Sequence, residues 1–232
     1  MPAMNTPTQR YARLAGAMYL LTMATAMFSE GYVRMTLLVA DSAAQTAQNL
    51  IQSNQLYRLA LVSDLLTFAG VVVLVWALYQ LLRPVDARLA VLALGFRLVE
   101  GGAHFAAVAF GVTAMSLLAA GEYVRGFEPA QLHGLVGFAL RAQGAGLNLG
   151  FIPLGLGSAV FAWLLWRSRY VPRWLSGWGI FASLLLASYA LGVVAHPNVR
   201  DYFYIGMVPM FVYEVGLGLW LLFKGVRLEP DR

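Results

Sequence analysis

The sequence predicts an all-α protein that is embedded in a membrane. Of its 232 residues, 60% are hydrophobic and only 12% are charged, about half the charged fraction of a typical soluble domain. The mean hydropathy is +0.68, and a soluble protein of this size could not bury so much apolar surface. We therefore expect a polytopic integral membrane protein built as a bundle of transmembrane helices.

Six apolar runs are long enough to cross a bilayer, which takes about 20 residues per helix. They lie at about 13–33, 58–82, 88–119, 134–166, 174–195 and 203–224. The first run follows Arg10 and Arg13 as a secretory signal would, but it has no convincing cleavage site and is expected to be a retained anchor. Pro129 suits the first turn of the fourth helix, which is too long for one straight span and is expected to be tilted, broken or partly outside. Together the runs predict one transmembrane domain over residues 1–232.

Basic residues between the runs predict the orientation, because Lys and Arg that flank spans stay on the cytoplasmic side. Ten lie at the two ends and in the second and fourth connections: Arg10, Arg13, Arg83, Arg88, Arg167, Arg169, Arg173, Lys224, Arg227 and Arg232. Only four lie in the other connections: Arg34, Arg58, Arg125 and Arg200. Both termini are therefore predicted in the cytoplasm. The formal net charge of +5 reflects this topology, and nucleic acid is not an expected partner.

The first outer connection is expected to contain a short amphipathic helix. Asp41 and Ser42 can cap it, and it would run to about Gln52. Its apolar residues share one face at helical spacing: Ala43, Ala44, Ala47, Leu50 and Ile51. We expect this helix to lie on the outer membrane surface or to cover the bundle.

Ionisable groups inside the apolar runs are the candidate functional residues, because each costs several kcal/mol at membrane depth unless it is paired or hydrated. The helical rise of about 1.5 Å per residue places four of them near the midplane: Arg97, Glu100, His104 and Glu214. A second layer nearer the outside holds Glu30, Asp64 and Asn148, and an outer mouth holds Arg34, Arg58 and Arg141. Stacked in this way, these ten residues predict a ligand pocket that is entered from outside.

Each of these residues also has a simpler interpretation. Arg97 and a glutamate could equally form a buried ion pair that fixes helix register without contacting a ligand. His104 could be a hydrogen-bonded residue that serves helix packing. Glu30 and Asp64 are expected as hydrated partners of Arg34 and Arg58. The glycines of segment 144–157, around Asn148 and Pro153, favour close helix packing, although a broken helix that lines the cavity remains an alternative.

The residue types limit the chemistry. The chain has no cysteine and three histidines, which excludes disulfides, thiol catalysis and thiolate metal sites. A metal ion at Glu100, His104 and Glu214 would have a single histidine ligand, so no metal site and no cofactor is predicted.

Five stretches resemble a bacterial membrane family catalogued as domain of unknown function 4386. They are Arg13–Gly16, Asp41–Leu59, Leu78–Asp86 leading to Phe96–Glu100, Trp166–Arg173, and the final helix with Glu214 before Leu219–Leu222. The resemblance covers nearly the whole chain. It implies a multi-span protein of the bacterial inner membrane and assigns no activity and no site residues.

Three functions remain open. The first is binding or transport of a small lipophilic or amphipathic ligand in the predicted pocket. The second is a structural or accessory role in which the buried ion pairs only hold the bundle together. The third is an intramembrane enzyme that uses a protonated glutamate as general acid on a lipid or isoprenoid. The expected partners are membrane lipids, such a ligand and, in a homodimer, a second copy of the chain.

Overall fold

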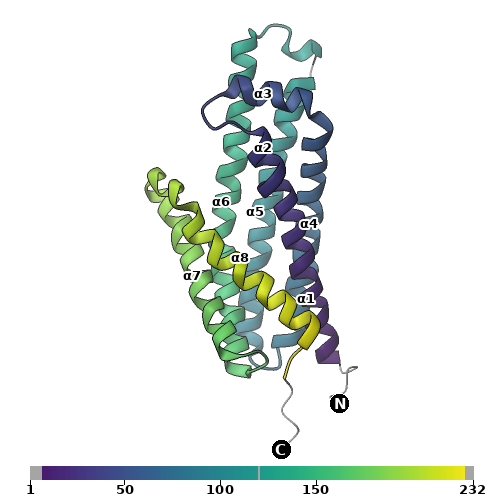
Figure 1. Cartoon of the computed structure of the whole chain (residues 1–232), viewed down its shortest axis with the longest axis vertical. Helices are drawn as coiled ribbons and strands as arrows, with labels where there is room; N and C mark the ends of the chain where they lie inside the picture. The colour runs from purple at the N-terminus through teal and green to yellow at the C-terminus, as the bar shows by residue number, and fades with distance from the viewer. Residues whose placement is uncertain (1–6, 120, 228–232) are drawn as a thin grey trace, which may run out of the picture. The chain divides into compact units, whose positions relative to one another are not determined.

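The computed structural model describes residues 7–119 and 121–227, and within them the chain forms helices and no strand (Figure 1). The elements are α1 (Pro7–Ala26), the π-helix η1 (Met27–Arg34), α2 (Met35–Leu37), α3 (Ala43–Gln52), α4 (Asn54–Leu82), α5 (Ala87–Ala119), the 3-10 helix η2 (Gly121–Val124), α6 (Pro129–Ser168), α7 (Arg173–Ala195), the 3-10 helix η3 (Pro197–Tyr202), α8 (Phe203–Leu219) and the π-helix η4 (Trp220–Lys224). The predicted all-α class is confirmed.

Five helical stretches of the described residues are long and apolar enough to cross a membrane. They are α4, α5, α6, α7 and the stretch Asn198–Lys224 that contains α8. These five stretches are the candidate membrane-spanning helices, and their bounds lie within a few residues of five predicted runs. The remaining run, 13–33, is also helical and forms most of α1 and η1, but it is less apolar because it carries residues such as Thr22, Ser29 and Glu30.

The fourth predicted run forms one continuous helix. α6 is 40 residues long and contains Pro153 without interruption, so the alternative of a broken helix is wrong. It begins at Pro129, as expected from the fixed φ of proline. A side chain at Gly155 would collide with the backbone of Ser183, and one at Gly157 with Ala93 and Arg97. Glycine at these two positions lets neighbouring helices approach closely, as the packing interpretation predicted.

The residue contacts divide the chain into two compact units. Unit 1 comprises residues 1–23, 69–102 and 148–232, and unit 2 comprises residues 24–68 and 103–147. Helices α4, α5 and α6 each contribute a segment to both units. One transmembrane domain over residues 1–232 stays a prediction.

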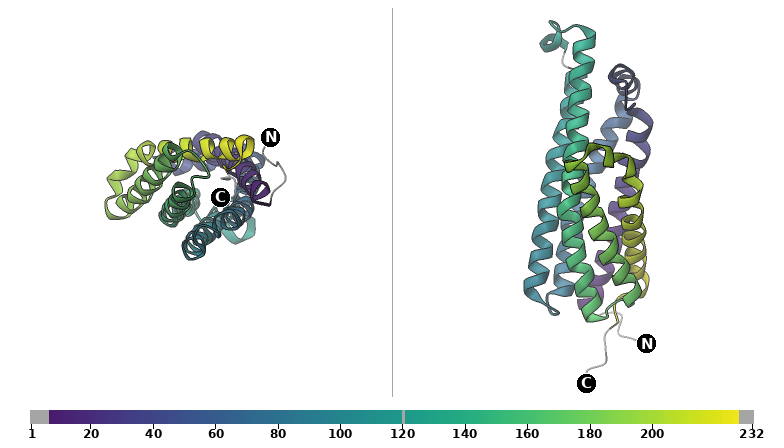
Figure 2. Two further views of the ribbon diagram at one scale, coloured as in Figure 1. Left: turned by 90° about the horizontal axis from the view of Figure 1, so that it is seen from below. Right: turned by 90° about the vertical axis from the view of Figure 1, so that its left-hand side faces the viewer.

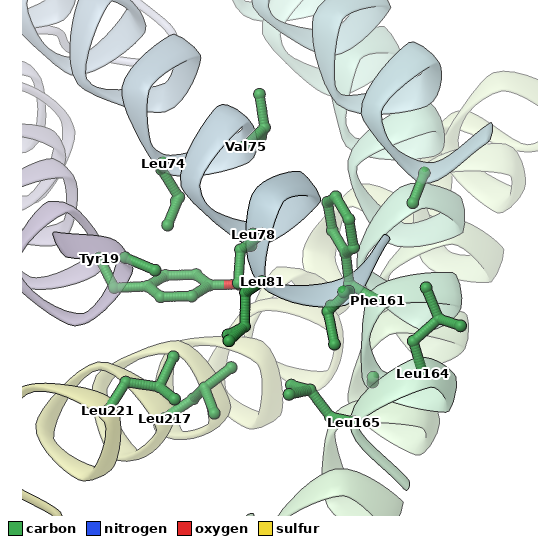
Figure 3. Close-up of a cluster of buried hydrophobic side chains, with 14 of the residues drawn as sticks. Tyr19, Leu74, Val75, Leu78, Leu81, Phe161, Leu164, Leu165, Leu217 and Leu221 are labelled. Atoms are coloured by element: carbon green, nitrogen blue, oxygen red, sulfur yellow. The ribbon is translucent and has the colours of Figure 1, made fainter. Parts of the chain in front are cut away.

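The core of unit 1 is built from apolar side chains of α1, α4, α5, α6, α7 and the α8 region. Figure 3 shows Tyr19 of α1 pointing toward Leu78 and Leu81 of α4, beside Leu217 and Leu221. All five side chains are at most 2% exposed. α7 and α8 run side by side in both Figure 1 and Figure 2 and pack closely along their length. This packing positions the polar residues that α5, α6 and α8 carry.

Several chain segments meet at one end of unit 1, the lower end in Figure 1. Gln9 at the start of α1 exchanges two hydrogen bonds with the backbone of Val226, at 2.6 and 3.1 Å. Asp86 caps α5 by accepting hydrogen bonds from the Leu89 and Arg88 N–H groups, and it pairs with Arg167 at 3.1 Å. These three interactions lower the pKa of the Asp86 carboxyl, and the hydrogen bond from the Leu89 N–H has the largest effect.

Unit 2 has a core of its own, with Val33, Leu50, Tyr57 and Val136 at 0% exposure. Helix α3 forms where the sequence predicted it, and the Ser42 hydroxyl accepts a hydrogen bond from the Gln45 N–H at 3.1 Å. Ser42 is therefore the N-cap. Of the five apolar residues predicted to share one face, Ala47 and Leu50 are buried, whereas Ala43, Ala44 and Ile51 are exposed. The predicted place of α3 on the outer membrane surface stays a prediction.

Candidate functional site

The first candidate site lies in unit 1 and consists of Arg97, Glu100, Ser158 and Glu214, which we call the Arg97 cluster. Arg97 Nε lies 3.1 Å from Glu100 Oε2, one helical turn along α5. Its Nη1 donates a hydrogen bond of 3.2 Å to the Ser158 hydroxyl of α6. The same Nη1 lies 3.8 Å from Glu214 Oε1 of α8. One guanidinium thus contacts polar groups on three helices.

The Arg97 cluster is buried and carries unequal charge. Arg97, Glu100 and Glu214 are 3%, 2% and 4% exposed. With both glutamates ionised, two carboxylates would face one guanidinium, so the cluster would hold one net negative charge in apolar surroundings. A buried charge of this kind is costly unless something neutralises it. A proton on one carboxyl or a bound cation would do so.

Two buried tyrosines border this cluster. Tyr19 and Tyr213 lie close enough to Arg97 to interact with its charge, as the two glutamates do. Tyr213 is 1% exposed, and its ring lies against Gly179, where any side chain would collide with it. Within the described part of the chain, the Tyr213 hydroxyl and Glu214 Oε1 have no hydrogen-bond partner. Such buried polar atoms are uncommon, and each calls for an explanation.

The second candidate site lies in unit 2 and consists of Glu30, Arg34, Tyr57 and Asp64, the Arg34 cluster. The Arg34 guanidinium pairs with the Asp64 carboxylate through both of its terminal nitrogens, and Nη1 also donates to Glu30 Oε1 at 2.6 Å. Arg34 and Asp64 are 6% and 4% exposed, whereas the Glu30 side chain is 48% exposed. This cluster also combines one arginine with two carboxylates.

Tyr57 extends the Arg34 cluster. Its ring centroid lies 5.9 Å from the Arg34 guanidinium carbon, a cation–π distance. Its hydroxyl donates a 3.0 Å hydrogen bond to Gln143 Oε1 of α6. Glu30 and Arg34 both belong to the π-helix η1, a rare element that is frequent at functional sites.

His104 and Asn148 contact backbone carbonyls. The His104 ring lies 3.0 Å from the Leu147 carbonyl, within unit 2. Its ring centroid is 5.5 Å from that of Phe68. The Asn148 amide donates to the Ala190 carbonyl at 3.2 Å, within unit 1. Because the predicted pocket residues fall into two units, the single cavity that would join them stays a prediction.

The predicted outer-mouth arginines differ from one another in burial. Arg58 and Arg141 are exposed, and Arg58 donates a 2.8 Å hydrogen bond to Asn54. Arg34 is buried and takes Asp64 as its partner, so the expected pairing of Asp64 with Arg58 is wrong. The physical reason is proximity, because η1 and α4 bring Arg34 and Asp64 into direct contact. Arg58 instead donates to Asn54, one turn away on its own helix.

Residues 14–225 match the family described as Domain of unknown function (DUF4386). The chain belongs to the DUF4386 family. A protein of Archaeoglobus fulgidus, described as "Uncharacterized protein", is 30% identical to this DUF4386 chain over 155 residues, which are 66% of the chain and 75% of the relative. No solved structure matches the DUF4386 chain. The resemblance predicted from the sequence is confirmed, and the family description names no activity.

Sequence reasoning missed several members and neighbours of the two clusters in this DUF4386 protein: Tyr19, Tyr57, Gln143, Ser158 and Tyr213. Gln143 is an amide inside the fourth predicted run and could have been found on that ground. Ser158 follows Gly157 and could have been found as a polar residue at a close helix contact. The tyrosines carry no comparable signal, because tyrosine is equally common at membrane interfaces.

Proposed function

We propose that this DUF4386 protein binds a small lipophilic or amphipathic ligand whose polar end carries a positive charge. The observation that carries the proposal is the charge of the Arg97 cluster, where Glu100 and Glu214 share the single guanidinium of Arg97. A ligand cation would neutralise the extra carboxylate, and surrounding apolar side chains would receive its hydrocarbon part. Glu214 Oε1 and the Tyr213 hydroxyl, which have no hydrogen-bond partner among the described residues, are the atoms we assign to it.

A proton is the competitor of such a ligand. Either a proton or a cation can neutralise the extra carboxylate, so binding of one would release the other. Ligand affinity is therefore expected to rise with pH. This exchange would also allow ligand movement to be coupled to protons.

The test uses the full chain in detergent and dodecylammonium as probe, because its N–H groups can donate hydrogen bonds to Glu214 Oε1 and the Tyr213 hydroxyl. We expect the probe to raise the unfolding temperature of the wild type but not of Glu214→Gln, in which one carboxylate and one guanidinium remain and the charge is balanced. Dodecanol has the same hydrocarbon chain without the cation and controls for insertion of the chain alone. Asp86→Asn controls for the loss of a carboxylate elsewhere. An equal shift with dodecanol, or an equal shift in Glu214→Gln, would contradict the proposal.

A structural role is the second candidate, and one observation favours it. Arg97 contacts Glu100 on α5, Ser158 on α6 and Glu214 on α8, so the cluster would fix the register of three helices without any ligand. Under this alternative no probe shifts the unfolding temperature. The triple variant Arg97→Met, Glu100→Gln and Glu214→Gln would then also support growth of the host cells as the wild type does.

We further propose that the chain crosses the cytoplasmic membrane six times, with α1 and η1 as the first span and both ends in the cytoplasm. The contacts Gln9–Val226 and Asp86–Arg167 support this, because they join the two ends and the second and fourth connections at one end of unit 1. Nine of the ten basic residues predicted as cytoplasmic belong to these segments. The tenth, Arg232, lies outside the described residues.

The absence of cysteine from the chain makes the topology directly testable. A membrane-impermeant maleimide should label Gln48→Cys, an exposed position of α3, in intact cells. It should label Arg88→Cys, an exposed position beside Asp86, only after lysis. Labelling of both positions from the same side would overturn the six-span arrangement.

A further inference from the structure

An arginine-lined pocket lies at the end of unit 1 where α6 passes into α7. It has a volume of about 350 Å³ and is lined by Arg169, Val171, Pro172, Arg173 and Arg227. Three of these five residues are arginines, and all three are exposed. We call this pocket, which neither candidate site includes, the arginine pocket.

The backbone on both sides of the arginine pocket is held in place. Arg169 has a φ of 57°, in the left-handed region, which turns the chain sharply between α6 and α7. The Arg227 N–H donates a 2.9 Å hydrogen bond to the Tyr170 carbonyl. Val226 is fixed by its two hydrogen bonds to Gln9. The three arginines are therefore brought together by the fold, although Arg227 is far from the other two in sequence.

The positive charge of the arginine pocket is not neutralised within the described part of the chain. The described carboxylates form no ion pair with Arg169, Arg173 or Arg227. Two of the guanidinium groups instead lie over aromatic rings. The guanidinium carbon of Arg173 is 5.8 Å from the ring centroid of Trp166, and that of Arg227 is 6.0 Å from the ring centroid of Trp220.

The start of α7 adds further positive potential. α7 begins at Arg173, its N-cap Pro172 makes no side-chain capping bond, and its first turn contains no acidic residue. The first N–H groups of a helix lack intrahelical acceptors and attract anions. Three guanidinium groups and a helix N-terminus thus favour an anion with several acceptor oxygens.

Exposed aromatic side chains lie on the helix ends that lead to the arginine pocket, and Trp174 directly follows Arg173 in the sequence. Trp174 is 68% exposed, Trp163 47% and Phe223 71%. Tryptophan at the ends of transmembrane helices lies at the level of the lipid headgroups. The arginine pocket is therefore expected at the height of the lipid phosphates.

We propose that the arginine pocket binds the phosphate group of an anionic phospholipid headgroup. Basic pockets between the cytoplasmic ends of transmembrane helices suit such headgroups, and three arginines offer the phosphate oxygens paired N–H donors. The exposed face of Trp174 would contact the adjoining acyl chain. This site is separate from the Arg97 cluster, and its occupation does not depend on the ligand proposed there.

The test measures binding of phosphatidylglycerol to the purified full chain in phosphatidylcholine nanodiscs. The single variants Arg169→Gln, Arg173→Gln and Arg227→Gln are each expected to weaken binding about fivefold, and the triple variant should abolish it. Arg88→Gln is the matched control, because Arg88 is an exposed arginine of the predicted cytoplasmic side that does not line the pocket. Unfolding temperatures in pure phosphatidylcholine check that the variants are folded.

Three results would overturn the proposal. The first is equal weakening by Arg88→Gln, which would show general surface attraction. The second is full binding by a folded triple variant. The third is displacement of the lipid by millimolar inorganic phosphate or glycerol phosphate, which would assign the site to a free phosphate. If the lipid stays bound in the presence of these anions, the result supports binding of the lipid headgroup.

Discussion

Arg97 of α5 forms an ion pair with Glu214 of α8, with 3.8 Å between Nη1 and Oε1. Both side chains are almost fully buried, and helices α6 and α7 separate them in the sequence. The pair therefore forms only when α5 and α8 pack in their final register. Since Glu100 competes for the same guanidinium, the stability of unit 1 depends on the balance of these three charges.

Replacing Arg97 alone should be far more damaging than replacing it together with Glu100 and Glu214. Arg97→Met removes the guanidinium that Glu100 and Glu214 share, and we expect it to lower the free energy of unfolding by about 3–5 kcal/mol. Combining it with Glu100→Gln and Glu214→Gln should restore most of this loss, because the Arg97 cluster then carries no charged side chain. Denaturant unfolding in detergent measures both values, and a single variant as stable as the triple variant would contradict the assignment.

The two carboxylates of the Arg34 cluster should differ in their contribution to stability. Asp64 is 4% exposed and pairs with both terminal nitrogens of Arg34, so Asp64→Asn should cost about 3 kcal/mol. The Glu30 side chain is 48% exposed, and solvent screening should limit Glu30→Gln to at most about 1 kcal/mol. The same unfolding assay compares the two variants. A larger effect at Glu30 would refute this order.

Gly157 should tolerate no side chain. A Cβ there would lie 2.9 Å from Arg97 Cγ and 3.0 Å from the Ala93 carbonyl oxygen, so Gly157→Ala should cost about 1–3 kcal/mol through overpacking. Gly95 of α5 is the control, because nothing lies within 4 Å of a Cβ at that position. Gly95→Ala should be neutral or stabilising by up to about 1 kcal/mol, since alanine is the better helix former. Equal effects of the two substitutions would exclude steric contact as the cause.

Asp86 should give the protein an acid-sensitive component of stability. The Leu89 and Arg88 N–H groups and Arg167 lower its pKa in the folded state from the ordinary 3.8. A lowered folded-state pKa means that the contribution is complete above the unfolded-state pKa and is lost as the pH falls through the folded-state pKa.

Comparing wild type with Asp86→Asn tests this pH dependence. The difference between their unfolding temperatures should be constant above about pH 5 and shrink toward zero as the pH falls below about 4. Arg88→Gln, which keeps the Arg88 N–H, should behave like the wild type. A difference that grows on acidification would reverse the assigned sign.

Much of the fold could be predicted because it depends on local composition. The bounds of α4, α5, α6 and α7 follow from the length of their apolar runs, and the start of α6 follows from the fixed φ of Pro129. The Ser42 N-cap was likewise predictable, since the capping bond joins residues three apart. Such features involve neighbours in sequence, so they do not depend on how the helices pack.

The candidate sites could be predicted only in part. Glu100 and Arg97 share a face of one helix, so their proximity follows from helical spacing. Ser158 and Tyr57 were missed because a small hydroxyl or a tyrosine in an apolar run is unremarkable until a partner lies opposite it. The partner of Asp64 was mistaken for the same reason, since the sequence does not say which arginine faces it.

The sequence by itself determined that the chain is helical, that it is apolar enough to lie in a membrane and that its charged residues would need partners there. These properties follow from side-chain hydrophobicity and helical periodicity, which act within one segment. Only the tertiary structure decided that Arg97 pairs with Glu214 as well as Glu100 and that Arg34 pairs with Asp64. It also decided that Arg227 lines the same pocket as Arg169 and Arg173. These pairings depend on the rotation and register of packed helices, and many registers would bury the same apolar faces equally well.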